Sequence, residues 1–239
     1  MPYCEVSIKV LDEQGRYLRD AAQDEIGNLC IRGATVFKGY LQAGKNAGIW
    51  VNGDWFNSGD LGRIDADGYI WLTGRSKDLI IRGGHNIDPQ MIEEALHSHP
   101  AVALAAAVGK PDEKAGELPV VYVQLKPGCQ ASEEELLAHA AAHISERAAV
   151  PKDAWIIDAI PVTAVGKTFK PALRFDAIRR VYQAAVAELD SAIRVEVLGD
   201  ERLGQLAHIH LPRRDSQLEQ AVSKRLAGFA APIQLHCSD

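Results

Sequence analysis

The chain has 239 residues, of which 47% are hydrophobic, and its formal net charge at pH 7 is −6. This length can form one large domain or two to three small ones, and the apolar content is enough for a buried core. The negative charge and the lack of a long basic run argue against non-specific nucleic-acid binding. The four cysteines are widely separated, which favours reduced thiols in a cytoplasmic protein over a disulfide framework.

No segment has the pattern of a membrane span or of a secretory signal. The longest apolar stretch runs from Ala101 to Val108, far short of the ~20 residues that a membrane-spanning helix needs. The first residues, Met1–Glu5, contain no basic stretch leading into an apolar run. The sequence therefore predicts a cytoplasmic protein with no membrane span.

Residues 1–76 predict a β-rich region. Polar and apolar residues alternate with a period of two in Val6–Val10 and in Asn28–Arg32, as in strands with one buried face. A third strand is predicted at Gly68–Leu72, after a turn at Asp65–Gly68.

From about residue 78 the pattern changes to alternating helices and strands. Asp88 can cap a helix that has Pro89 at its first position, and Ser132 begins a capping-box pattern before a second helix. Strands are predicted at residues 102–108, 120–125 and 155–157. Together with the β-rich start, this pattern indicates an α+β fold.

The last part of the chain predicts one more long helix and a small β-β-α-β unit. The helix begins near Pro171, and its apolar side carries Leu173, Ala177, Val181 and Ala184. In residues 189–239, strands are predicted at 194–198, 206–211 and 232–237, with a helix capped by Asp215. A unit this small rarely buries enough surface to be stable alone, so we expect it to pack on its neighbour.

Asp60 and Arg75 are candidates for binding a ribose. Asp60 lies in a glycine-rich segment, which we interpret as a tight turn, and a carboxylate there can accept hydrogen bonds from two vicinal hydroxyls. Arg75 could contact the same sugar or its phosphate through two parallel hydrogen bonds. The alternatives are a turn aspartate that binds its own backbone and an arginine in a surface ion pair.

Lys167 is the candidate for chemistry, because it follows Gly166 in a proline loop that begins at Ile160. A lysine ammonium is a compact charge that suits an anionic transition state and a leaving pyrophosphate. The alternative is a solvated surface lysine. Gly83 and Gly84 resemble a backbone nest for phosphate, or else form a simple turn before the helix capped by Asp88.

Two histidines of the extension, His208 and His210, would lie on the same side of a strand, as two metal ligands would. The sequence shows no third ligand near them. The prediction is therefore a surface pair, and no metal site is assigned.

Several motifs, in order and at the usual spacings, resemble those of the AMP-forming acyl-CoA synthetases. This family belongs to the adenylate-forming superfamily, together with firefly luciferase and the adenylation domains of peptide synthetases. The motifs are WFNSGDLG at 55–62, GYI at 68–70, GRSKDLIIRGGHNI at 74–87, IEE at 92–94, HPAV at 99–102, GKPDE at 109–113, GE at 116–117 and PVTAVGK at 161–167. They cover roughly residues 1–180, so the extension falls outside the common pattern.

The resemblance implies a role for each candidate in the first half-reaction. Asp60 would bind the ribose hydroxyls of ATP, and Arg75 would assist at the same nucleotide. Lys167 would be the adenylation lysine, which bridges the acyl carboxylate and the α-phosphate. Family members form an acyl-adenylate and pyrophosphate, usually with Mg²⁺, and then transfer the acyl group to coenzyme A with release of AMP.

The resemblance also implies a movement between the two half-reactions. Lys77 would lie at the hinge about which a small C-terminal lid domain swings. After that rotation, Gly83 and Gly84 would line the channel for the pantetheine arm of coenzyme A. The implied domains are the end of the N-terminal adenylation domain at 1–76, the lid at 77–188 and an extension of unknown role at 189–239.

The sequence departs from the family pattern in two ways. Val162 and Val165 stand where the family usually has a basic residue and a Ser or Thr, which affects the geometry of the lysine loop rather than Lys167. No Ser/Thr/Gly-rich phosphate loop ending in Pro-Lys occurs in the chain. We therefore expect a C-terminal portion whose Mg²⁺ and triphosphate are held largely by an N-terminal domain, and whose β-rich segment could pair with another copy.

The implied function is ligation of a small-molecule carboxylic acid to coenzyme A at the expense of ATP, as in fatty acid metabolism, by a chain that is inactive alone. One alternative is a non-catalytic truncated product or binding module that keeps the lid fold. An amino-acid-activating domain or a luciferase-like oxidase is a further alternative, because acyl selectivity lies mostly outside these residues. The sequence does not indicate which acid is used.

Overall fold

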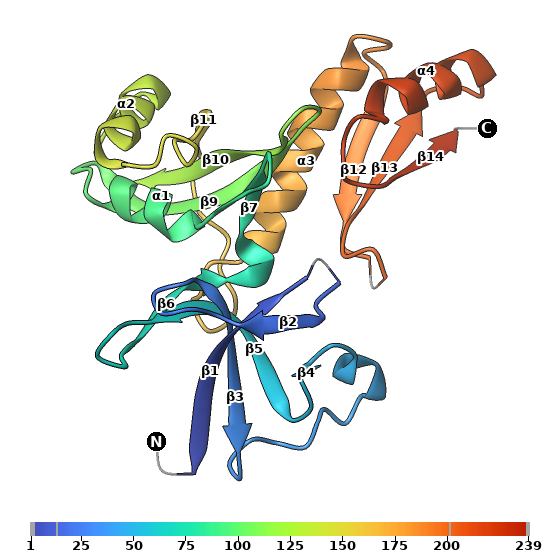
Figure 1. Cartoon of the computed structure of the whole chain (residues 1–239). Helices are drawn as coiled ribbons and strands as arrows, with labels where there is room; N and C mark the ends of the chain where they lie inside the picture. The colour runs from blue at the N-terminus through green and yellow to red at the C-terminus, as the bar shows by residue number, and fades with distance from the viewer. Residues whose placement is uncertain (1–2, 13, 201, 238–239) are drawn as a thin grey trace. The chain divides into compact units, whose positions relative to one another are not determined.

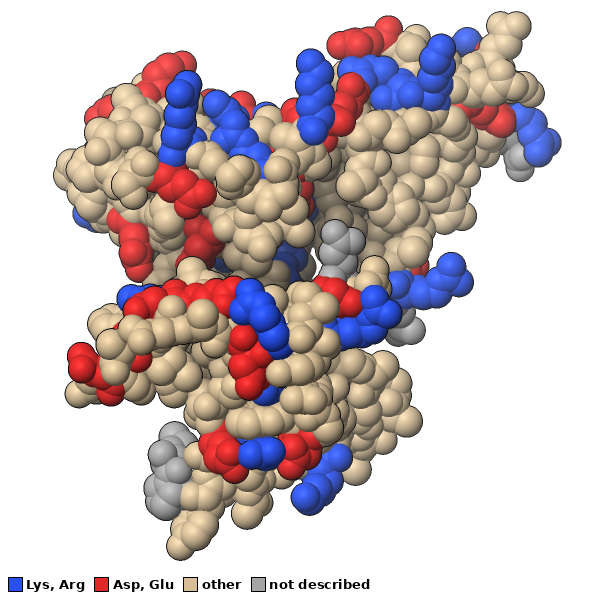
Figure 2. Space-filling model, viewed as in Figure 1, with Lys and Arg blue, Asp and Glu red and all other residues tan. Residues whose placement is uncertain are grey.

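The chain divides into two compact units, Met1–Asp78 and Leu79–Asp239. Figure 1 shows the computed structural model, which describes residues 3–12, 14–200 and 202–237. Among these residues, none of the helices combines the length and the apolar character that a membrane crossing requires. Lys and Arg side chains are interspersed with Asp and Glu on the visible face of each unit (Figure 2).

The first unit is a six-stranded antiparallel sheet with the order β2-β1-β3-β5-β4, in which β6 also pairs with β5. Its strands are β1 (Cys4–Leu11), β2 (Tyr17–Asp20), β3 (Gly27–Gly33), β4 (Trp50–Val51), β5 (Trp55–Ile64) and β6 (Ile70–Arg75). Two short 3₁₀ helices are η1 (Ala43–Asn46) and η2 (Ser76–Asp78). The predicted strands at β1 and β3 are confirmed, and the third begins two residues later than predicted.

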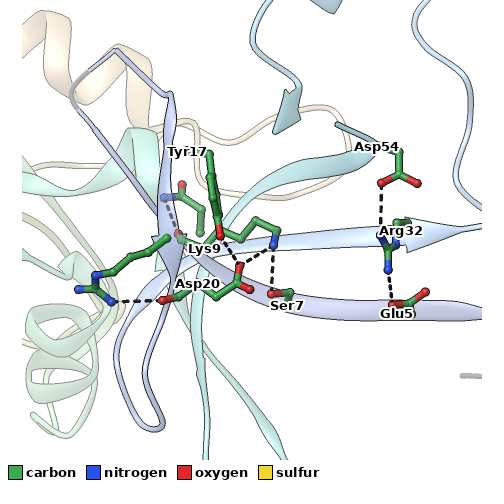
Figure 3. A network of polar contacts seen from close by, with 9 residues as sticks. Glu5, Ser7, Lys9, Tyr17, Asp20, Arg32 and Asp54 are labelled. Carbon is green, nitrogen blue, oxygen red and sulfur yellow. Dashed lines mark hydrogen bonds and ion pairs between the residues drawn. The ribbon is translucent and has the colours of Figure 1, made fainter. Parts of the chain in front are cut away.

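A buried lysine connects three strands of this sheet (Figure 3). The side chain of Lys9 in β1 is 2% exposed, and its Nζ lies 2.7 Å from Asp20 Oδ1 in β2. The same ammonium lies 4.3 Å from the ring centre of Trp55 in β5, and Arg32 lies 4.5 Å from that ring centre. The hydrogen bond from Lys9 lowers the pKa of Asp20, so the Asp20 carboxylate stays charged at neutral pH. The paired and hydrogen-bonded charge explains why Lys9 can be buried.

Cys30 provides an internal probe of the folding of the first unit. It is fully buried beside Val51 and Trp55, and burial raises the pKa of its thiol to about 11. Since the thiolate is the reactive form, we expect Cys30 to resist alkylation in the folded protein, whereas the exposed Cys129 reacts quickly. Mass spectrometry after a pulse of iodoacetamide in increasing urea measures the labelling of both cysteines. Rapid labelling of Cys30 without urea would contradict its buried position.

The second unit contains a five-stranded sheet with the order β11-β10-β7-β8, in which β9 also pairs with β10. Its elements are β7 (Ile80–Arg82), β8 (His85–Ile87), α1 (Pro89–His97), β9 (Val102–Asp112), β10 (Gly116–Leu125), α2 (Glu133–His143), β11 (Asp153–Ile156) and α3 (Lys170–Ala187). Alternate residues of β9 and β10 face opposite sides. One side packs against α1 and α2, and the other against α3.

The predicted helix caps of this sheet domain are confirmed. The carboxylate of Asp88 accepts a hydrogen bond from the Gln90 amide at the start of α1. The hydroxyl of Ser132 accepts one from the Glu135 amide at the start of α2. The carboxylate of Glu135 lies near His99 instead of returning to Ser132, so only one arm of the capping box forms.

The extension contains β12 (Arg194–Leu198), β13 (Leu206–Leu211), α4 (Ser216–Leu226) and β14 (Ile233–Cys237). Its three strands form a separate sheet in the order β12-β13-β14, with β12 and β13 antiparallel and β13 and β14 parallel. All four predicted elements of this β-β-α-β unit are confirmed. The boundary between lid and extension at 188/189 remains a proposal, because both lie within the second compact unit.

The extension packs on the second half of α3. The buried residues there are Ile178, Tyr182, Ala185 and Val186, whereas Ala184, predicted to be buried, is exposed. The prediction was wrong at Ala184 because the first half of α3 faces the large sheet, while the second half faces the extension on a different side. At the edge of this contact, Arg225 Nη1 of α4 lies 2.5 Å from Glu113 Oε1 in the turn between β9 and β10.

Candidate functional site

A bulge in β5 carries Asp60. In the pairing of β3 with β5, Asn28 lies opposite Leu61 and Cys30 lies opposite Asn57. One residue of β3 therefore lies opposite three residues of β5, so β5 contains two extra residues at this point. The sequence predicted a tight turn around Asp60. That was wrong, because the strand continues through the bulge.

The bulge depends on local backbone chemistry. Gly59 has φ of +76°, a left-handed conformation that favours glycine. The hydroxyl of Ser58 donates a hydrogen bond to the Leu29 carbonyl and accepts one from the Asp60 amide at 3.1 Å. These contacts fix the backbone at Asp60 without using its carboxylate.

The Asp60 carboxylate forms an ion pair with Arg75. The two residues lie directly opposite each other on β5 and β6, and Arg75 Nε is 2.9 Å from Asp60 Oδ1. The side chains are 53% exposed for Arg75 and 30% exposed for Asp60. Exposed pairs of this kind contribute about 0–1 kcal/mol, so a polar ligand can take over these contacts at little cost.

Lys77 is exposed in the short helix η2, one residue before the end of the first compact unit at Asp78. The backbone on its N-terminal side is attached to the first unit, because Ser76 Oγ donates a hydrogen bond to the Gly59 carbonyl. A change of backbone angles at Lys77 would therefore act at the division between the units. Its role as the hinge remains a proposal.

Gly83 and Gly84 form the two-residue turn between β7 and β8. Arg82 pairs with His85 across this turn, and the φ angles of the two glycines are +56° and +85°. Two consecutive positive φ angles define the tight hairpin turn in which glycine is preferred at both positions. A Cβ at either glycine would meet no atom within 4 Å. The preference for glycine therefore comes from the backbone conformation and not from crowding by neighbours.

We expect Gly84→Ala to destabilise the second unit by about 1–2 kcal/mol, because alanine is strained in the left-handed conformation. Gly199→Ala is the matched control, since Gly199 has no left-handed φ and an added Cβ would lie 3.6 Å from the Phe175 ring. Urea unfolding followed by the helix signal at 222 nm reports this unit, because the four α-helices in the described part of the chain belong to it. Equal stability of the two variants would contradict the turn assignment.

A basic cavity of about 530 Å³ lies beside this turn within the second unit. Its charged or titratable lining consists of Arg82, His85, Lys114 and Arg147. Arg82 is held in place by a hydrogen bond from its Nη1 to the Ala148 carbonyl at 2.6 Å. The sequence analysis did not identify Lys114 or Arg147, because they come from separate loops that only the fold brings together.

The lysine loop is a closed turn with a free side chain at its end. Val162 and Thr168 form a β-bridge across it. The Thr163 amide donates to the Lys167 carbonyl at 2.7 Å, and the Lys167 amide donates to Thr163 Oγ1 at 3.1 Å. Gly166 adopts φ of +78° to close the turn. The Lys167 side chain is exposed and has no ion pair with any residue that the structure describes.

Lys170, three residues further on, has the opposite character. Its Nζ lies 2.7 Å from Glu93 Oε1 in α1, and both side chains are less than one-fifth exposed. The same Glu93 oxygen accepts a hydrogen bond from the Ala107 amide in β9 at 2.9 Å. This partly buried pair attaches the start of α3 to α1 and β9, so the turn that presents Lys167 has a fixed base.

Comparisons with known proteins agree with this architecture. Residues 91–167 match the sequence model of the family described as the AMP-binding enzyme C-terminal domain. The chain is 43% identical over 226 residues to marinolic acid–CoA ligase of Pseudoalteromonas sp. (strain SANK 73390), an alignment that covers 94% of this chain and 35% of that protein. ATP-bound MatB from Rhodopseudomonas palustris matches with a TM-score of 0.66 and 28% identity, over 73% of this chain and 34% of that one.

A complex of o-succinylbenzoate-CoA synthetase from Bacillus subtilis with its acyl-adenylate intermediate matches with a TM-score of 0.64 and 31% identity, over 73% of this chain and 34% of that one. The fold and motifs thus define the chain as a C-terminal portion of an adenylate-forming enzyme. Within that superfamily, its residues 91–167 match the AMP-binding enzyme C-terminal domain, and the curated relatives named above and others that it matches are CoA ligases. The chain spans about a third of the length of the curated relatives it matches, and the 94% coverage by marinolic acid–CoA ligase includes most of the extension.

Proposed function

We propose that this chain supplies the lid and the end of the nucleotide platform of an ATP-dependent acyl-CoA ligase. The reaction joins a carboxylic acid to coenzyme A and converts ATP to AMP and pyrophosphate. The observation that carries the proposal is Lys167, which is exposed and has no ion pair with any described residue, at the end of a closed turn whose base is attached by the Lys170–Glu93 pair. An ammonium presented in this way can meet a reacting phosphate without first giving up an ion pair.

The nucleotide would be held by Asp60 and Arg75 in the first unit. The Asp60 carboxylate already forms an ion pair with Arg75 and keeps lone pairs for the two ribose hydroxyls. Arg75 has further N–H donors for the same nucleotide. Because the existing pair is exposed and weak, binding ATP does not require the loss of a buried interaction.

Lys167 would act in the first half-reaction. A carboxylate oxygen of the acid attacks the α-phosphorus of ATP, and pyrophosphate leaves with the electron pair of the broken P–O bond. Negative charge is concentrated on the α-phosphate oxygens and on the attacking carboxylate, where the lysine ammonium would lie. An ammonium at this position stabilises the transition state more than the separated reactants.

Coenzyme A would use the turn at Gly83 and Gly84 and the cavity beside it. Two glycines without side chains leave room for the narrow pantetheine arm, and a Cβ there would occupy open space along the turn. Arg82, Lys114 and Arg147 supply positive charge for the coenzyme A phosphates. For Mg²⁺ no ligands are assigned, because no cluster of three acidic, histidine or cysteine side chains among the described residues is arranged to hold an ion.

A fusion experiment tests the proposal. The chain replaces the matching C-terminal part of marinolic acid–CoA ligase, and that enzyme's own acid serves as substrate. We expect the fusion to catalyse ATP–pyrophosphate exchange and thioester formation, whereas the 239-residue chain alone does neither.

The outcomes separate the two functions that the sequence left open. Thioester formation by the isolated chain would show that no further domain is needed and would contradict the proposal. A fusion that folds, as shown by circular dichroism, but lacks both partial reactions would favour a non-catalytic module that keeps the lid fold.

A further inference from the structure

Three histidines gather on one face of the sheet in the extension. His208 and His210 lie on β13, and His236 lies on the neighbouring β14, directly opposite His210. The sequence identified only the first two, since His236 is 26 residues further along and joins them through parallel strand pairing. The fold therefore brings a third histidine beside the predicted pair.

This face of the sheet is the one turned away from the core. On β13 the alternate residues Ala207, Ile209 and Leu211 are buried against α3 and α4, so His208 and His210 project from the opposite side. Glu196 of β12 lies on the same side as the histidines, because it pairs with His208 across the strands. The face thus carries three imidazoles and a carboxylate.

The imidazoles are close enough to share one ion. His208 Nδ1 lies 2.8 Å from His236 Nε2, and the rings of His210 and His236 stack with centres 5.0 Å apart. Two imidazole nitrogens bound to one tetrahedral zinc are about 3.3 Å apart, given Zn–N bonds of about 2.0–2.1 Å. The His208–His236 pair therefore already has nearly the separation of two ligands, and one metal ion would replace the proton that now lies between them.

We propose that His208, His210 and His236 form a binding site for a borderline divalent transition-metal ion, with Zn²⁺ as the reference ligand. Neutral imidazole is the preferred protein ligand for such ions. His210 would complete the set by turning its ring from its stack on His236. Glu196 Oε2, which lies 3.8 Å from His210 Nε2, can orient that ring or provide a fourth ligand.

In the metal-free structure the three histidine rings do not yet surround one common position. Among the described residues, no three His, Cys, Asp or Glu side chains are already placed around a common metal position. Bringing His210 into the set requires a rotation of its side chain, which is 46% exposed. The proposed ion would bind within the extension. Its binding can therefore be measured without any ligase activity.

The test is zinc binding by the full 239-residue chain without an affinity tag. Calorimetry and competition with a chromophoric chelator measure the stoichiometry and affinity. We expect one saturable site per chain, at least about tenfold weaker in His236→Asn and in His210→Asn, and lost in the double variant His208→Asn/His236→Asn. Zinc is also expected to raise the Tm of the unmodified chain but not that of the double variant.

His143→Asn is the matched control, because His143 is an exposed histidine on α2 within a different histidine cluster. It is expected to keep the full zinc affinity. His210 and His143 are exposed, whereas His208 and His236 are partly buried, and an unchanged Tm without zinc confirms that each variant folds. Undiminished binding in the double variant, equal loss in His143→Asn, or no saturable binding by the unmodified chain would each overturn the proposal.

Discussion

In the fusion enzyme described above, Lys167→Ala is expected to slow formation of the acyl-adenylate by about 10²–10³-fold, the usual effect of removing one preorganised group that stabilises transition-state charge. ATP–pyrophosphate exchange measures this step. Lys167 is exposed and unpaired among the described residues, so its removal is expected to change the free energy of unfolding by less than about 0.5 kcal/mol. The loss of rate would therefore come from the missing ammonium in the transition state and not from unfolding of the protein.

The second half-reaction gives the sharpest control for Lys167. Supplied with a preformed acyl-adenylate, the Lys167→Ala fusion is expected to make the thioester at nearly the normal rate. Lys152→Ala, which removes another exposed lysine of the same unit, is expected to leave both steps unchanged. An equal fall in both half-reactions would indicate damage to the loop, and full adenylation activity would remove Lys167 from the mechanism.

Tyr182→Ala is expected to destabilise the second unit by about 3–5 kcal/mol, the typical cost of deleting a large buried ring. Tyr182 of α3 is fully buried in the core shared with the extension, and its hydroxyl donates a hydrogen bond to the Ala231 carbonyl at 2.8 Å. Burial raises the pKa of Tyr182 to about 12, so the hydroxyl remains a donor at ordinary pH. Urea unfolding at 222 nm measures the effect.

Tyr182→Phe separates the ring from its hydrogen bond. It keeps the packing but leaves the buried Ala231 carbonyl without this partner, at a cost of about 1–3 kcal/mol. We expect the order of stability to be the unmodified chain, then the Phe variant, then the Ala variant. A Tyr182→Ala chain as stable as the unmodified one would show that the extension does not depend on α3.

Elements governed by local patterns were the most predictable from the sequence. The caps at Asp88 and Ser132 and the strands of the extension are confirmed, because each depends on residues within a few positions of one another. Asp60 was misjudged, since a glycine before an aspartate fits a turn as well as a bulge, and only the register with β3 distinguishes them.

Features that depend on pairing between distant segments could not be predicted in this way. The partner of Lys170 is Glu93 on another helix, and the basic cavity combines Arg82 with Arg147. The apolar side of α3 changes along its length because two different neighbours cover it, and a single helical periodicity cannot describe both. The motifs indicated candidate side chains, whereas the neighbours of those side chains had to come from the fold.

The continuity of α3 has a mechanical consequence. One uninterrupted helix enters two hydrophobic cores, with Leu173 and Ala177 in the first and Tyr182 and Val186 in the second. The helix α3 thereby connects the extension directly to the large sheet. In the proposed lid movement the extension would therefore turn together with the lid, so a macromolecule bound to the extension would slow that movement.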